Sequence, residues 1–276
     1  MVKLPAIVTF ANQKGGVGKT TLCLSFANYL LTKGVRVAVV DCDFQQSIAK
    51  ARAKDLRKYG EEGTPYDVFS SDINDRSAMI DLIGRMHNNA NVEVSVVDVP
   101  GSLKAPGLVP LFVNSDIIVV PFHYDRITIA STAGFLYMLS KLKEKMGGKM
   151  TTRIVMIPNI HDGRVGKRSE LILWDETRDT FSNYGTVTPK ISKKADMERL
   201  STMAALDLQI PVVAPAFDKI YRELFDKTDP LRGSSLSGIQ IAEVNKPKAN
   251  KKIQKKEIEK EENITDSNTP LNHRAI

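Results

Sequence analysis

A run of lysines and glycines near the start of the chain carries the clearest chemistry in the sequence. It comprises Lys14, Gly15, Gly16, Val17, Gly18, Lys19, Thr20 and Thr21. The apolar stretch Ile7 to Ala11 precedes it, and helical apolar spacing follows it. A glycine-rich turn between a strand and a helix gathers backbone N–H groups that can bind nucleotide phosphates. Lys19 would then reach the β- and γ-phosphates, and the Thr20 hydroxyl would hold Mg²⁺.

The spacing of this run departs from the common phosphate-binding motif G-x-x-x-x-G-K-[ST]. That motif requires glycine at position 13, where the chain has Gln13, and the chain carries an extra lysine, Lys14, before the paired glycines. A chance glycine-rich turn is the alternative, which the flanking strand and helix disfavour. The run resembles the deviant Walker A box of the ParA/MinD family, and the resemblance covers nearly all of the chain before its C-terminal tail.

An acidic segment follows the second predicted strand, Val35 to Asp41. Its residues D-C-D-F-Q resemble the D-x-D-P-Q motif of the family, with Phe44 in the place of the proline. Carboxylates at the carboxyl end of a strand lie beside the phosphates in such sheets. The resemblance implies that Asp43 orders the attacking water and that Asp41 supports Mg²⁺ or the loop. Helix capping is a competing interpretation of Asp41.

Two further strand ends resemble family positions. Asp98 follows the apolar strand predicted over Val92 to Val97 in a Walker B arrangement, where it would hold Mg²⁺ through water. Gly101 would let the next loop approach the γ-phosphate. Asn159 follows the predicted strand Arg153 to Pro158 and resembles the residue that contacts adenine, although a turn-forming asparagine is the alternative. The resemblance thus implies ATP and Mg²⁺ as cofactors.

The elements that must position these residues alternate between strands and helices. Two further strands are predicted, at Ile117 to Pro121 and at Gln209 to Val213, and the part of the latter from Ile210 to Val213 resembles the closing base-side loop of the family. Helices are predicted at Lys19 to Lys33, Ser77 to Met86, Ile127 to Met146, Leu171 to Phe181 and Ala216 to Asp226. The alternation predicts an α/β fold, a doubly wound and mostly parallel sheet with helices on both faces, as in P-loop NTPases. We expect Trp174 to anchor the core.

The composition, 42% hydrophobic and 26% charged over 276 residues, is that of a globular protein. The apolar runs are too short to span a membrane and no signal peptide is evident, so we expect a cytoplasmic protein without stable membrane association. Cys23 and Cys42 lack metal-ligand spacing and are expected to be buried thiols. We expect an ATPase domain over residues 1–244 and a charged, disordered tail over 245–276.

Basic residues in the last third of the chain suggest a polyanionic partner. They are Lys190, Lys193 and Lys194, at helical spacing, with Arg199, Lys219 and Arg222. The resemblance implies non-specific binding of DNA phosphates by such residues, and an ordinary solvated helix face is the alternative. It also implies that Lys14 crosses a homodimer interface to the other subunit's nucleotide. ATP would then close the dimer, which would associate with the nucleoid, and hydrolysis would open it.

The resemblance implies a slow, partner-stimulated ATPase of plasmid or chromosome partitioning. Because the phosphate loop begins at residue 14, no helix-turn-helix domain is expected before it, and a ParB-type or ribbon-helix-helix centromere-binding protein would recognise the DNA site. A VirC-like ATPase of a conjugative transfer module is an alternative. A MinD-like membrane-associated regulator would need an amphipathic C-terminal helix, for which the tail has few large apolar residues. A dethiobiotin-synthetase-like ligase would not need Lys14 as a contact between subunits.

Overall fold

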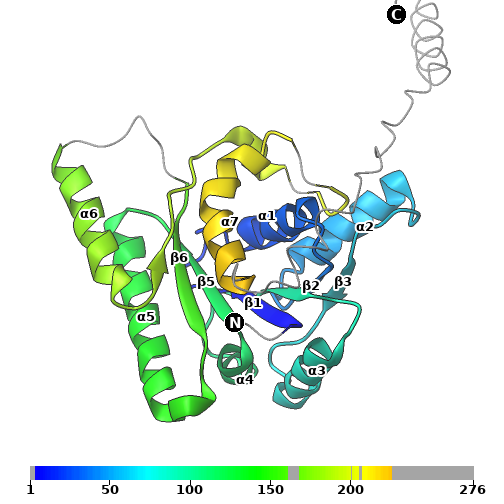
Figure 1. Ribbon diagram of the computed structural model, residues 1–276, viewed down its shortest axis with the longest axis horizontal. Helices are drawn as coiled ribbons and strands as arrows, with labels where there is room; N and C mark the ends of the chain where they lie inside the picture. Colours follow the sequence, from blue (N-terminus) through cyan, green and yellow to red (C-terminus); the bar gives the residue numbers. More distant parts are fainter. Residues whose placement is uncertain (1–3, 161–167, 200, 205–206, 226–276) are drawn as a thin grey trace, which may run out of the picture. The chain divides into compact units, whose positions relative to one another are not determined.

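A parallel β-sheet runs through the described part of the chain (Figure 1). The computed structural model describes residues 4–160, 168–199, 201–204 and 207–225. Its strands are β1 (Ala6–Phe10), β2 (Val37–Asp41), β3 (Asp67–Ser70), β4 (Val94–Asp98), β5 (Ile117–Phe122), β6 (Arg153–Pro158) and β7 (Thr186–Val187). They are ordered β3-β2-β4-β1-β5-β6-β7, and every strand pairing in the described residues is parallel. The predicted α/β fold with a mostly parallel sheet is therefore confirmed.

Helices cover both faces of this sheet, and each face has its own apolar core (Figure 1). The helices are α1 (Lys19–Thr32), α2 (Ser47–Tyr59), α3 (Arg76–Asn88), α4 (Leu108–Asn114), α5 (Arg126–Met146), α6 (Arg168–Ser182) and α7 (Ile210–Leu224), with short 3-10 turns η1 (Gly147–Lys149) and η2 (Ala195–Glu198). One core joins the sheet to α1 and α7, and the other joins it to α3, α4 and α5. Because both faces are covered, β1, β2, β4 and β5 are buried at every position.

The strand predicted over Gln209 to Val213 is wrong, because Gln209 is the N-cap of helix α7 and Ile210 to Val213 form its first turn. Proline is tolerated in the first turn of a helix, where its missing N–H would have no partner, so Pro211 does not interrupt α7. Val213, Ala216, Phe217, Ile220 and Leu224 are buried at helical spacing along this helix. Apolar content alone could not separate a short strand from the first turn of a buried helix.

Two elements near the site were not predicted. Helix α2 buries only Ile48 and Arg52, so its sequence lacks the apolar stripe by which helices are recognised. Strand β3 lies at the sheet edge, where its residues are exposed or half-buried. Both elements depend on the neighbours against which they pack rather than on a strong local pattern.

Other predictions concern the chain ends, the thiols and the membrane. The proposed tail, residues 245–276, lies outside the described residues, as does its boundary with the ATPase domain. Cys23 and Cys42 are free and buried, as predicted. Within the described ranges, no helix combines the length and apolar character that crossing a membrane requires.

Candidate nucleotide-binding site

The carboxyl edge of the sheet brings the predicted motifs together. In the parallel register, Asp98 at the end of β4 lies opposite Phe10 at the end of β1 and opposite Asp41 at the end of β2. The glycine-rich loop leaves β1 at this same edge and enters α1 at Lys19. Residues that are far apart in the sequence therefore meet because parallel strands end on one side.

Asn12 anchors the start of the glycine-rich loop, a role that the sequence analysis missed. Its side chain is fully buried, and its amide nitrogen donates hydrogen bonds to the Pro121 carbonyl (2.8 Å) and to Thr132 Oγ1 (2.9 Å). Its amide oxygen accepts from the backbone N–H of Lys14 at 3.2 Å. A buried polar side chain must find such partners. The feature of the sequence that could have indicated this role is an asparagine directly after an apolar strand.

Asn159 closes the other side of the loop. Its side-chain nitrogen donates to the Val17 carbonyl at 2.8 Å, and its backbone N–H donates to the Phe122 carbonyl at 2.7 Å. Gly18 has φ +89°, and a Cβ on it would overlap the Asn159 amide group. Asn159 thus ties the end of β6 to the loop, and its predicted contact with adenine stays a prediction.

Lys19, Thr20 and Asp98 form the buried centre of the site. Thr20 Oγ1 donates to Asp98 Oδ2 at 2.6 Å, while Asp98 Oδ1 is buried and has no hydrogen-bond partner in the described residues. Burial raises the pKa of Asp98 to about 7, although the Thr20 hydrogen bond and Lys19 oppose the rise. Burial lowers the pKa of Lys19, and the negative charges of Asp98 and Asp43 oppose that shift.

The oxygen donors in this centre fit a hydrated Mg²⁺ ion. Mg²⁺ keeps several waters and takes only one or two protein oxygens beside phosphate ligands. The Thr20 hydroxyl and the unpartnered Asp98 Oδ1 supply such oxygens. Residues 4–160, 168–199, 201–204 and 207–225 contain no group of three or more His, Cys, Asp or Glu side chains that could hold a metal on their own. The site therefore suits a metal that arrives with a nucleotide.

In the acidic segment after β2, Asp41 and Asp43 make different contacts. Asp41 is buried, and its carboxylate accepts from the backbone N–H groups of Asp43 (3.2 Å), Ile48 (2.9 Å) and Ala49 (3.1 Å). It therefore caps the N-terminus of α2, as the competing interpretation proposed. Asp43 is half-buried and accepts from the Gln45 N–H at 2.8 Å. The predicted roles of Asp41 at Mg²⁺ and of Asp43 at the attacking water stay predictions.

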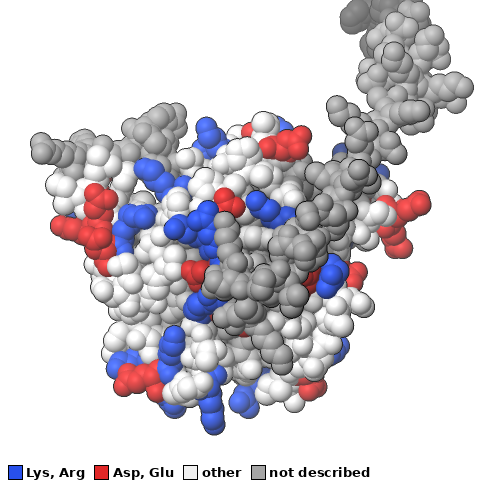
Figure 2. Space-filling view, viewed as in Figure 1, with Lys and Arg blue, Asp and Glu red and all other residues white. Residues whose placement is uncertain are grey.

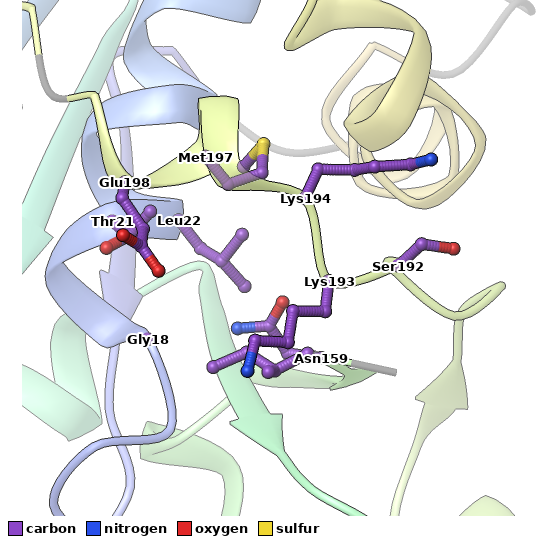
Figure 3. Close-up of a pocket in the computed structure, with 10 residues that line it drawn as sticks. Gly18, Thr21, Leu22, Asn159, Ser192, Lys193, Lys194, Met197 and Glu198 are labelled. Atoms are coloured by element: carbon purple, nitrogen blue, oxygen red, sulfur yellow. The ribbon is translucent and has the colours of Figure 1, made fainter. Parts of the chain in front are cut away.

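A cavity of about 250 Å³ opens beside the loop (Figure 3). It is lined by Gly18, Thr21, Leu22, Asn159, Ile160, Ser192, Lys193, Lys194, Met197 and Glu198. In Figure 3 the Lys193 side chain extends toward Asn159, whereas Lys194 points away from the cavity. Ile160 has φ +52°, which is strained for a β-branched residue. The cavity has room for an aromatic base next to bound phosphates.

The structure corrects the expected placement of the basic residues. Lys190, Lys193 and Lys194 do not share a helix face, because they lie in the extended segment between β7 and η2. All three are exposed, and so are Arg199, Lys219 and Arg222. The last two lie three residues apart on α7, and so on neighbouring turns. Figure 2 shows Lys and Arg side chains around the position of α7, on the face of the molecule that is in view.

Trp174 is not the core anchor that we expected. It is half-buried on α6 and stacks on Tyr124, with ring centroids 5.0 Å apart and planes at 25°. Lys190 Nζ lies 5.9 Å from the centre of the indole ring, within cation–π range. Leu171 and Ile172 on the same helix are exposed, so the buried face of α6 is narrow and Trp174 lies near the surface.

Comparison with known proteins identifies the family. A family model described as the CobQ/CobB/MinD/ParA nucleotide binding domain matches residues 8–267. The chain belongs to this family. It is 26% identical over 180 residues to the chromosome-partitioning ATPase Soj of Thermus thermophilus, a match that covers 57% of this chain and 70% of Soj.

Two solved structures show the same fold. One is a Borrelia burgdorferi B31 protein, assigned to plasmid partition and bound to AMPPNP, with a TM-score of 0.61 and 20% identity; the match covers 81% of this chain and 99% of that one. The other is the ParA of pNOB8 bound to nonspecific DNA, with a TM-score of 0.54 and 17% identity over 80% of this chain and 97% of that one. The fold and the family are those of ParA/MinD-type nucleotide-binding ATPases.

Proposed function

We propose that this chain is a ParA-like ATPase that dimerises on ATP, binds DNA non-specifically and segregates DNA together with a centromere-binding partner. The observation that carries this proposal is the contrast between the two lysines of the glycine-rich loop. Lys19 is buried beside Gly101 and within electrostatic range of the Asp98 carboxylate, where it would serve its own site. Lys14 is half-buried, and its ammonium forms no ion pair with any described residue. A lysine so placed is available to a second subunit.

The hydrolysis that we propose relies on positioning and on neutralisation of charge. The loop N–H groups and Lys19 would bind the phosphates, and Thr20 and Asp98 would hold Mg²⁺, which neutralises phosphate charge when bound. Asp43 would orient the attacking water, because it lies close enough to Lys19 and Asp98 to affect the pKa of each. Asn12 and Asn159 would keep the loop in shape during this chemistry. The cavity beside Asn159 would take adenine.

The proposed dimer and DNA contacts make the nucleotide a switch on assembly. Lys14 of each subunit would reach the phosphates bound to the other, so that hydrolysis removes the contact. The exposed basic residues of the extended segment and of α7 would bind DNA phosphates, an interaction that salt weakens. The likeness to Soj supports a role in partitioning, and recognition of the DNA site would fall to a ParB-type or ribbon-helix-helix protein. We propose that the protein does not associate stably with membranes.

Light scattering of three lysine variants, with and without ATP and Mg²⁺, tests the dimer. The wild-type mass should rise from 30.6 kDa to about twice that value on ATP. Lys14→Ala should bind ATP with wild-type affinity but stay monomeric, whereas Lys19→Ala should lose ATP binding. The matched control is Lys149→Ala, an exposed lysine in η1 at the opposite edge of the sheet, which should dimerise normally.

Two results would contradict the proposal. An ATP-dependent dimer in Lys14→Ala would remove the role of Lys14 between subunits. Wild-type ATP affinity in Lys19→Ala would remove the site itself.

DNA binding is measured on the same samples by fluorescence anisotropy with a labelled random duplex. It should require ATP and should weaken steeply as the salt concentration rises.

A further inference from the structure

One wall of the cavity is an irregular segment that must be held in place by its neighbours. This wall comprises Ser192–Glu198, of which only the short turn η2 has regular structure. The buried side chain of Gln209, before α7, donates to the carbonyls of Asp196 (2.6 Å) and Arg199 (2.8 Å). These bonds fix the wall on the side of α7. A separate contact is needed to fix it on the side of α2.

Helix α2 supplies that contact through Asp55. Asp55 Oδ2 accepts from both the backbone N–H (2.7 Å) and the hydroxyl (2.8 Å) of Thr202, whose side chain is fully buried. Hydrogen bonds to a carboxylate are the stronger class in proteins. Because both donors belong to one residue and both meet one oxygen, Asp55 fixes the position of Thr202 and its orientation.

Neighbouring residues reinforce the contact between α2 and this segment. Asn28 of α1 donates to the Ser201 carbonyl at 2.8 Å and accepts from the Tyr66 hydroxyl at 2.9 Å. Arg52 of α2 donates to the Tyr66 carbonyl at 2.7 Å and contacts the Met203 sulfur at 3.6 Å. The segment after the cavity wall is thus bonded to α1 and α2 through consecutive residues.

We propose that Asp55 is a positioning residue for the base-side wall of the nucleotide site. The inference rests on the proposed ATP site, because it assigns the cavity to the base. The hydrogen bonds of Asp55 among the described residues go to Thr202 and not to the glycine-rich loop or the cavity lining, so we infer that it acts through Thr202. Helix α2 begins at the N–H groups that Asp41 caps, so this helix joins the acidic motif to the base-side wall.

The test compares ATP with inorganic tripolyphosphate, which has phosphates but no base. Both are titrated with Mg²⁺ into the full-length protein by calorimetry. Asp55→Ala should weaken ATP binding about tenfold, as expected for loss of two hydrogen bonds to a carboxylate, and should leave tripolyphosphate affinity within about twofold of wild type. Asp55→Asn retains an oxygen that can accept both bonds, so it should restore ATP affinity to within about threefold.

The matched control is Asp75→Ala, which removes a carboxylate that caps α3 by accepting from the Ala78 N–H at 2.9 Å. It loses a comparable bond outside the cavity and should bind both ligands normally. If Asp55→Ala does not fold, Thr202→Val removes one of the two bonds at nearly constant volume and should weaken ATP binding alone, about threefold.

Three outcomes would overturn the inference. In the first, Asp55→Ala or, where it does not fold, Thr202→Val binds ATP as the wild type does. In the second, the variant loses ATP and tripolyphosphate affinity equally, which indicates general damage to the loop. In the third, Asp75→Ala shows the same selective loss. A wild-type protein that binds no ATP would instead remove the proposed function and, with it, the inference. The two failures are distinguished by the wild-type titration.

Discussion

Replacing Gly18 by alanine tests how the loop and Asn159 depend on each other. Gly18 has φ +89°, where an alanine is strained by about 1–2 kcal/mol. The new Cβ would also overlap the Asn159 amide and displace it from the Val17 carbonyl, which it reaches at 2.8 Å. Losing that bond adds about 1 kcal/mol. We expect the free energy of unfolding to fall by about 2–3 kcal/mol in total.

Gly16 provides the control for this experiment. It has φ +77°, and a Cβ on it would meet no atom within 4 Å, so Gly16→Ala carries the backbone strain without the collision. Any gain from restricting the unfolded chain is shared by both substitutions and cancels in their difference. Gly18→Ala should therefore cost about 1 kcal/mol more than Gly16→Ala in urea denaturation of the nucleotide-free protein.

The Asn159→Ala background completes the cycle. There the collision and the hydrogen bond are both absent, so the two glycine substitutions should cost the same. The reasoning would be refuted if Gly18→Ala were no more damaging than Gly16→Ala in the native background, or if their difference persisted without the Asn159 amide. Either result would mean that Asn159 does not support the loop.

Two further predictions concern the carboxylates at the sheet edge. Burial raises the pKa of Asp98 to about 7 from 3.8, so the folded protein binds a proton that the unfolded chain releases, and the free energy of unfolding falls as pH rises through this window. In EDTA, Asp98→Asn should therefore gain about 2–3 kcal/mol over the wild type between pH 5 and pH 8, and a constant difference in denaturation would contradict this. Asp41→Ala should lower the free energy of unfolding by about 2 kcal/mol, because three N–H groups lose their acceptor. Asp75→Ala, which removes an ordinary helix cap, should lower it by about 1 kcal/mol. Equal losses in thermal denaturation would show that Asp41 is no more than a simple cap.

The sequence predicted those parts of the fold whose local pattern is strong. The buried strands β1, β2, β4, β5 and β6 carry near-continuous apolar runs, and each was predicted to within two residues at either end. The pattern failed where packing decides the outcome. The pattern predicts a strand at the apolar start of α7, and it does not indicate the charged helix α2.

The basic residues show a second limit of spacing arguments. Lys190, Lys193 and Lys194 have helical spacing, but spacing predicts a shared face only if the segment forms a helix. The chain there is extended after β7, and the Lys193 side chain points into the cavity while Lys194 points away from it (Figure 3). A role in nucleotide binding or in DNA binding could not be separated before this placement was known.

The phosphate loop follows from the sequence alone, because backbone N–H groups, glycine flexibility and a lysine within one short run suffice to specify it. The contacts that support the loop, by contrast, depend on the three-dimensional fold. Asn159 reaches the loop from the end of β6, Asn12 fixes its start by bonding to Pro121 and Thr132, and Asp55 of helix α2 bonds to Thr202, after the cavity wall. These contacts join residues more than a hundred positions apart or residues on separate elements. They exist because parallel strands end at one edge of the sheet, a relation that no local pattern contains.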